Sequence, residues 1–237
     1  MNTQDTHYFD GQLPLTGYLA EASNQRIKRP GILLIHGGAG LDEHARNRAR
    51  LFASSGYLVH ACDMYGDGVA GDRQRVMARL AELRSNRDMI VKRAQAGIDV
   101  LRSDPRSDGR IAVVGYCFGG MVALELARAG GLLAGVVSVH GSLMGIKPAE
   151  NSEVKAKILV CHGALDPHVP ITQVTDFIAE MNRAEADWQM AVYGGAAHGF
   201  THENAAVYKD PGVAYDATAD ARSMAAIGQF LQTCFGS

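Results

Sequence analysis

Features that mark several specialised classes of protein are scarce in this chain of 237 residues. It has four cysteines, and no two of them form a CxxC pair or a zinc-ligand pattern. No apolar run approaches the roughly 20 residues needed to cross a bilayer. Residues 1–11 lack the basic stretch and apolar segment of a secretory signal. These absences predict a cytoplasmic protein whose thiols stay reduced.

The chain also lacks an excess of charge of either sign. The chain has 23 Lys and Arg against 25 Asp and Glu, a formal net charge of -2, and neither sign forms a long run. This balance argues against nucleic acid and against an anionic membrane as partners. The rest of the composition, 47% hydrophobic and 20% charged, is that of an ordinary globular protein. We expect residues 1–237 to form one domain.

Short apolar runs alternate with longer amphipathic stretches. The runs are rich in β-branched residues and bounded by Gly, Pro or Asp, which is typical of parallel strands buried on both faces. They lie at residues 32–35, 57–61, 111–114, 136–139, 158–161 and 189–193. Helical patterns lie at residues 42–54, 72–103 (with a break near 84–86), 119–129, 171–183 and 215–235. The alternation predicts an α/β fold with a mostly parallel central sheet and helices on both faces. Residues 6–9 and 13–19 suit a hairpin at the sheet edge.

The most specific local pattern is the segment GYCFGG at residues 115–120. It follows one predicted strand and precedes a predicted helix, so it matches the G-x-S-x-G nucleophile elbow with cysteine in place of serine. Small residues on either side of Cys117 let strand and helix pass closely, and the helix N-terminus favours a thiolate or an oxyanion. Cys117 is therefore the candidate nucleophile. The alternative is a glycine-rich turn around a buried cysteine. This segment has neither the P-loop pattern nor the G-x-G-x-x-G pattern that would favour phosphate binding.

An elbow nucleophile needs a base and an acid, which follow it along the chain at the ends of later strands. Asp166 lies in the turn after the strand at 158–161, and His198 lies in the loop after the strand at 189–193. Each residue alone has an ordinary reading, a turn aspartate before proline or a loop histidine among glycines. Their order favours a Cys117–His198–Asp166 triad. We treat the neighbouring histidines as structural or pocket-lining: His140, His162, His168 and His202.

The oxyanion hole should pair the N–H of Phe118 with an N–H from the glycine loop after the first core strand. We choose Gly38 as this second donor, with a simple turn as the alternative. Other pocket-lining candidates have ordinary core packing as their alternative. They are Gly37, Tyr65, Tyr116, Phe200 and His202.

Together these motifs resemble the dienelactone hydrolase family of α/β-hydrolases from about residue 31 to residue 230. The resemblance rests on the elbow, on GLDEHAR at 40–46, DMYGDG at 63–68, GALDP at 163–167, HGF at 198–200, GVAY at 212–215 and Arg222-Ser223. It implies the α/β-hydrolase fold and a carboxylic-ester hydrolase of the carboxymethylenebutenolidase type. Such enzymes cleave small esters or lactones through a Cys-His-Asp triad and a covalent thioester, with no metal and no organic cofactor. We expect a monomer or small homo-oligomer.

Two departures from the family pattern bear on activation and substrate. Many members carry an acidic residue beside the resting thiol, where this chain has Gly37, so we expect a thiolate paired with protonated His198. Members that cleave dienelactones hold the substrate carboxylate with arginines, and near the corresponding loops this chain has Asp67 and His202. This difference argues against an anionic dienelactone. Other open readings are a thioesterase or peptidase with the same triad, a non-catalytic binding protein, and a redox sensor that uses Cys117.

Overall fold

The computed structural model describes residues 1–23, 27–69, 71–150 and 153–236. Contacts within the chain divide it into two compact units, Met1–Val114 and Gly115–Ser237. The boundary falls inside strand β5 (Ser107–Tyr116). Each unit combines strands with covering helices, so the α/β prediction is confirmed. The single domain over residues 1–237 stays a prediction.

The first unit contains a four-stranded arrangement in the order β1-β2-β4-β3. Its strands are β1 (Asn2–Asp10), β2 (Leu13–Glu21), β3 (Arg29–Ile35) and β4 (Leu58–Cys62). The predicted hairpin is confirmed, since β1 and β2 pair antiparallel around a turn with Gly11 at φ +62°. Strands β3 and β4 pair parallel, while β2 pairs antiparallel with β4.

Polar side chains cap the three helices of the first unit. Helices α1 (Glu43–Ser54), α2 (Arg73–Arg84) and α3 (Arg87–Ser103) begin after Asp42, Asp72 and Asn86, and each of these caps accepts a backbone N–H of the first turn. The break predicted within residues 72–103 is therefore confirmed, because Asn86 starts a new helix.

Helices α1 and α3 lie on opposite faces of the strands. On one face, His60 Nδ1 lies 3.0 Å from the Gly97 carbonyl of α3. On the other face, Arg50 of α1 donates to the Tyr18 hydroxyl at 3.0 Å. Tyr18 pairs with Ala61, and adjacent residues of a strand point to opposite faces. This arrangement explains why β3 and β4 are apolar nearly throughout.

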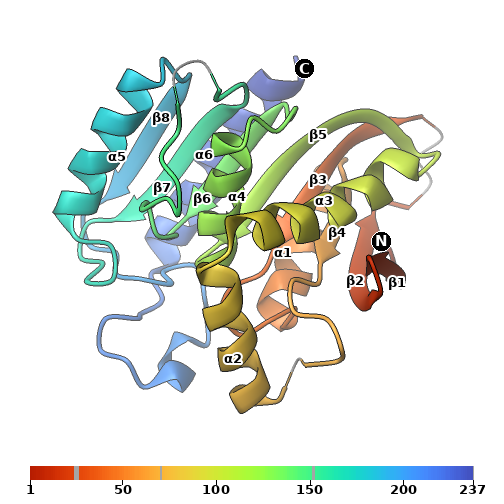
Figure 1. The fold of residues 1–237 in the computed structure, drawn as a ribbon, viewed down its shortest axis with the longest axis horizontal. Helices are drawn as coiled ribbons and strands as arrows, with labels where there is room; N and C mark the ends of the chain where they lie inside the picture. The colour runs from red at the N-terminus through yellow and green to blue at the C-terminus, as the bar shows by residue number, and fades with distance from the viewer. Residues whose placement is uncertain (24–26, 70, 151–152, 237) are drawn as a thin grey trace. The chain divides into compact units, whose positions relative to one another are not determined.

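In the second unit, three parallel strands run in the order β6-β7-β8 (Figure 1). They are β6 (Gly135–Val139), β7 (Lys157–Gly163) and β8 (Trp188–Tyr193). The helical segments are α4 (Phe118–Arg128), α5 (Ile171–Arg183), the short 3₁₀ helix η1 (Ala205–Tyr208) and α6 (Ala217–Phe235). Gly120 of α4 approaches Ser138, whereas Gly135 approaches Phe230 of α6. Helices α4 and α6 therefore cover opposite faces of β6.

A buried ionic network ties α4 to α5. Arg128 is 1% exposed and donates to both carboxylate oxygens of Glu180, at 2.8 and 2.9 Å. It also donates to Glu125, which is fully buried, and to the Leu143 carbonyl. Glu125 accepts the N–H of Ile146, and Glu180 accepts that of Ala149. The network thus fixes the loop after β6 as well as the two helices.

Candidate active site

The candidate nucleophile lies on a sharp turn between β5 and α4. Cys117 has φ +53° and ψ -112°, and its N–H donates to the Val139 carbonyl at 2.9 Å. A Cβ on Gly115 would lie 1.9 Å from the Gly119 carbonyl oxygen, so only glycine fits there. A non-glycine residue with positive φ is costly and persists only where its surroundings enforce it. The local structure therefore has the strand, turn and helix that the elbow pattern predicts.

The second unit brings the three predicted triad residues together. His198 Nε2 lies 3.1 Å from Cys117 Sγ, and His198 Nδ1 lies 2.8 Å from Asp166 Oδ2. The Asp166 side chain is fully buried, and its other oxygen accepts the backbone N–H groups of His168 and Val169. Asp166 follows β7 and His198 follows β8, so the carboxyl ends of parallel strands carry both residues. This geometry links a thiol, an imidazole and a carboxylate in one chain of contacts.

Electrostatics favours a charged imidazole in this chain of contacts. Burial by itself lowers the pKa of His198, but hydrogen bonds to Asp166 and Cys117 outweigh it and raise the pKa to about 10. For Asp166, burial opposes ionisation, yet the hydrogen bond from His198 leaves the carboxyl pKa below its usual value. An imidazolium beside a sulfur atom stabilises the thiolate. A protonated His198 would therefore favour the thiolate form of Cys117.

Three further histidines lie close to His198. The rings of His140 and His168 lie 5.3 and 5.1 Å from the His198 ring, both edge to face. His162 interacts electrostatically with Asp166 and His198, and burial lowers its pKa. His140 Nε2 also lies 2.9 Å from Thr201 Oγ1. Sequence reasoning treated these residues as structural or pocket-lining. The position of His168 two residues after Asp166 was a usable signal of its closeness to the site.

Two of the predicted wall residues of the second unit are deeply packed. Tyr116 and Phe200 are at most 1% exposed. The Phe200 ring contacts the rings of His140 and Tyr193. His202 Nε2 lies 3.1 Å from the Tyr208 hydroxyl of η1. Contact of these side chains with substrate stays a prediction.

The glycine loop after β3 belongs to the first unit and is braced from two sides. Tyr65 is buried, and its hydroxyl donates to the Gly38 carbonyl at 2.8 Å. His36 Nε2 accepts the N–H of Met64, so its Nδ1 carries the proton and donates to the Gly37 carbonyl. Burial lowers the pKa of His36, which keeps this tautomer neutral. Tyr65 thus orients the loop, while the oxyanion role of Gly38 stays a prediction.

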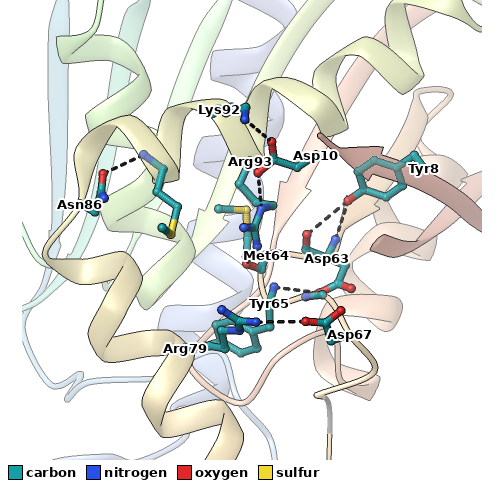
Figure 2. A network of polar contacts seen from close by, with 12 residues as sticks. Tyr8, Asp10, Asp63, Met64, Tyr65, Asp67, Arg79, Asn86, Lys92 and Arg93 are labelled. Carbon is teal, nitrogen blue, oxygen red and sulfur yellow. Dashed lines mark hydrogen bonds and ion pairs between the residues drawn. The ribbon is translucent and has the colours of Figure 1, made fainter. Parts of the chain in front are cut away.

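Figure 2 shows the polar network around residues 63–68, the segment that carries Tyr65. Asp63 accepts the N–H groups of Tyr65 and Gly66, and its own N–H donates to the Tyr8 hydroxyl. Asp67, with φ +53°, accepts a hydrogen bond from Arg79 of α2 at 3.0 Å. The Asp67 carboxylate is therefore already paired with a cation.

Metal sites and membrane spans are absent from the part of the chain that the structure describes. Within it, no cluster of three or more His, Cys, Asp or Glu side chains could hold a metal ion. The same residues contain no helix with both the length and the hydropathy needed to span a membrane.

Comparisons with known proteins show which family and which solved structures this chain is similar to. The sequence model of the dienelactone hydrolase family matches residues 15–235. A carboxymethylenebutenolidase of Pseudomonas putida is 26% identical over 193 residues, which are 78% of this chain and 81% of that protein. An uncharacterised protein of Caenorhabditis elegans is 36% identical over 60% of this chain and 92% of its own length. The crystal structure of a dienelactone hydrolase-like promiscuous phosphotriesterase from metagenomic libraries has a TM-score of 0.92 and 35% identity, with 98% of each chain covered.

Proposed function

Because the chain belongs to the dienelactone hydrolase family and is a carboxylic-ester hydrolase, we propose that it acts through a Cys117–His198–Asp166 triad. One observation carries the proposal. The imidazole of His198 lies 3.1 Å from the Cys117 sulfur on one side and 2.8 Å from the Asp166 carboxylate on the other. Nucleophile and base within contact distance, with the base oriented by a third group, are the signature of an activated nucleophile.

The reaction begins with the Cys117 thiolate paired to protonated His198. The sulfur attacks the carbonyl carbon of a small ester or lactone, and the backbone N–H groups of Phe118 and Gly38 stabilise the oxyanion. When the tetrahedral intermediate collapses, the C–O bond breaks and the leaving alkoxide takes the proton of His198. A thioester then links the acyl group to Cys117.

Water completes the cycle. His198, now neutral, takes a proton from water as that water attacks the thioester carbonyl, and the collapse releases the carboxylic acid and the thiolate. Asp166 holds the imidazole in the required tautomer and stabilises the imidazolium in both halves of the reaction. Asp67 and His202 offer a substrate carboxylate no arginine clamp, so we propose neutral esters and lactones as substrates.

Hydrolysis of p-nitrophenyl acetate tests the triad. We expect Cys117→Ala to lower kcat by about 10⁴-fold or more. We expect Asp166→Asn, which keeps the size of the side chain, to lower kcat by about 10²-fold to 10⁴-fold. Cys234→Ala is the matched control, because Cys234 lies in α6 away from the triad, and it should keep the wild-type rate. A Cys117→Ala enzyme with wild-type turnover would refute the assignment.

A panel of substrates separates the remaining alternatives. Small lactones, acyl esters, thioesters and peptides differ in leaving group, so their kcat/KM values separate an esterase from a thioesterase or peptidase. Paraoxon belongs in the panel because a promiscuous phosphotriesterase is 35% identical over nearly the whole chain. Loss of each observed activity in Cys117→Ala would assign it to the same site. Peroxide-dependent modification of Cys117 without turnover of any substrate would instead favour a redox sensor.

A further inference from the structure

The segment at residues 210–214 holds the backbone of His198 on both sides. The N–H of His198 donates to the Gly212 carbonyl at 3.0 Å, and the N–H of Ala214 donates to the His198 carbonyl at 3.1 Å. These bonds form an isolated parallel bridge between His198 and Val213. The segment includes part of the GVAY motif, which takes no part in the proposed triad mechanism. We call residues 210–214 the strap.

The strap also contacts the loop that carries the acid. Asp210 Oδ2 lies 3.1 Å from His168 Nε2, and Asp210 Oδ1 accepts the N–H of Gly212 at 2.8 Å. A Cβ on Gly212 would lie 2.4 Å from Pro167 Cγ, so the strap and the acid loop are in close contact. One short segment thus touches the acid loop through Asp210 and Gly212, and the base loop through its backbone.

His168 connects its contact with Asp210 to the proposed base, His198. Its backbone N–H donates to Asp166 Oδ1 at 2.8 Å, and its ring meets the His198 ring edge to face at 5.1 Å and 82°. The other titratable groups that face His198 are on four different segments. They are Cys117 on the elbow, Asp166 on the acid loop, His140 after β6 and His162 on β7.

We propose that His168 and Asp210 form a positioning pair for the catalytic base, a second imidazole–carboxylate pair outside the triad. The inference rests on the proposed role of His198. Asp210 fixes the orientation of the His168 imidazole, and that imidazole limits the tilt of the His198 ring toward Cys117. Both residues act through His198 and are positioning residues. The restricted tilt of the His198 ring matters because small displacements of reacting groups lower reaction rates sharply.

Three variants and a control test the pair. Asp210→Asn keeps an oxygen that can accept the Gly212 N–H but removes the charge facing His168, and His168→Ala removes the ring. The third variant combines both changes. Asp187→Asn is the control, because it breaks an exposed ion pair with Lys157 at the opposite ends of the strands. The readouts are kcat/KM for p-nitrophenyl acetate, the pH profile of Cys117 alkylation by iodoacetamide, and Tm.

We expect each single variant to lower kcat/KM by about 10-fold. We expect the acidic midpoint of Cys117 alkylation to rise by about 0.5 to 1 pH unit, because a misplaced imidazolium stabilises the thiolate less. The double variant should lose no more than His168→Ala alone, since both changes break one interaction. Asp187→Asn should keep the wild-type kcat/KM and alkylation midpoint.

An unchanged alkylation midpoint in His168→Ala and Asp210→Asn overturns the proposal, even if Tm falls, because that pattern belongs to a purely structural role. Losses that multiply in the double variant overturn it as well. Alkylation needs no ester substrate. If Cys117→Ala retained esterase activity and so refuted the proposed function, the alkylation midpoint would still decide whether the pair positions His198 on Cys117.

Discussion

At the scale of single residues, one thiol among four has a distinct environment. Burial raises the pKa of Cys161 to about 12 and that of Cys234 to about 11, and it also raises the pKa of Cys62. Cys117 instead faces an imidazole whose pKa is raised to about 10. Reactivity toward electrophiles follows the thiolate fraction. We therefore expect electrophiles to react selectively with Cys117 because of its contact with His198, and not because the cysteines are exposed in general.

We predict that iodoacetamide labels Cys117 first and at a nearly constant rate between about pH 6.5 and 9. An ordinary thiol has a pKa of about 8.5, and at pH values below that its reaction rate would rise about tenfold for each unit of increase in pH. Mass spectrometry of digested protein measures the rate at each cysteine. In His198→Gln we expect the ordinary slope to return. A tenfold-per-unit slope in the wild type would contradict the thiolate–imidazolium pair.

The lowered pKa of Asp166 predicts a dependence of stability on pH. A carboxyl whose folded pKa is depressed contributes stability above its unfolded pKa of about 3.9 and loses it as pH falls through the folded value. Urea denaturation of wild type and Asp166→Asn should therefore give a constant difference in unfolding free energy from pH 6 to 4.5. Below about pH 4 the difference should shrink. A difference that grows on acidification would show that the carboxyl is not stabilised as an anion.

At the scale of elements, the elbow depends on close approach of backbone atoms rather than on side-chain packing. The end of β5 and the first turn of α4 meet at Gly115 and Gly119, and Cys117 accepts a positive φ between them. The strand carries the sulfur to the N-terminus of α4, the positive end of the helix dipole. Any added atom at the crossing must move the strand or the helix, and Cys117 moves with either.

We predict that Gly115→Ala lowers the free energy of unfolding by about 3 kcal/mol or more, because its Cβ would overlap the Gly119 carbonyl. Gly228→Ala in α6 is the matched control. A Cβ there meets nothing within 4 Å, and alanine in a helix interior should add about 0.5 to 1 kcal/mol. Urea denaturation measures both. Equal effects of the two substitutions would show that the crossing at Gly115 is not tight.

At the scale of the whole molecule, buried polar groups add constraints beyond the apolar cores. In the second unit, Arg128, Glu125 and Glu180 place charges among apolar side chains, with each charge paired or hydrogen-bonded. Removal of one member leaves its partners buried and uncompensated, which costs far more than an exposed pair is worth.

We predict that Arg128→Ala destabilises the protein by about 3 to 5 kcal/mol. Lys157→Ala, which removes an exposed ion pair with Asp187, should change stability by less than about 0.5 kcal/mol. Chemical denaturation of the two variants gives the comparison. A small effect of Arg128→Ala would indicate that water or another cation reaches Glu125.

Local patterns in the sequence were sufficient for much of this architecture. Strand periodicity, the break before Asn86 and the elbow around Cys117 all depend on neighbouring residues, and each is present in the structure. The burial of Arg128 was not predictable, because its partner Glu180 comes from another helix. The pairing of His168 with Asp210 was equally hidden, since the strap returns to the acid loop only in three dimensions. The pocket-lining role of Tyr65 stays a prediction, and the hydrogen bond from its hydroxyl to the Gly38 carbonyl was not predictable from the sequence.

The strap has a consequence for how this enzyme can diversify. It binds His198 through main-chain hydrogen bonds, and the nearby side chains of Ala214 and Tyr215 are exposed. Substitutions at these two positions leave the main-chain groups that bond His198 unchanged. Gly212, in contrast, has no room for a Cβ beside Pro167. We therefore expect natural evolution and laboratory selection to accept substitutions at Ala214 and Tyr215, because these change the surface beside His198 without moving its backbone.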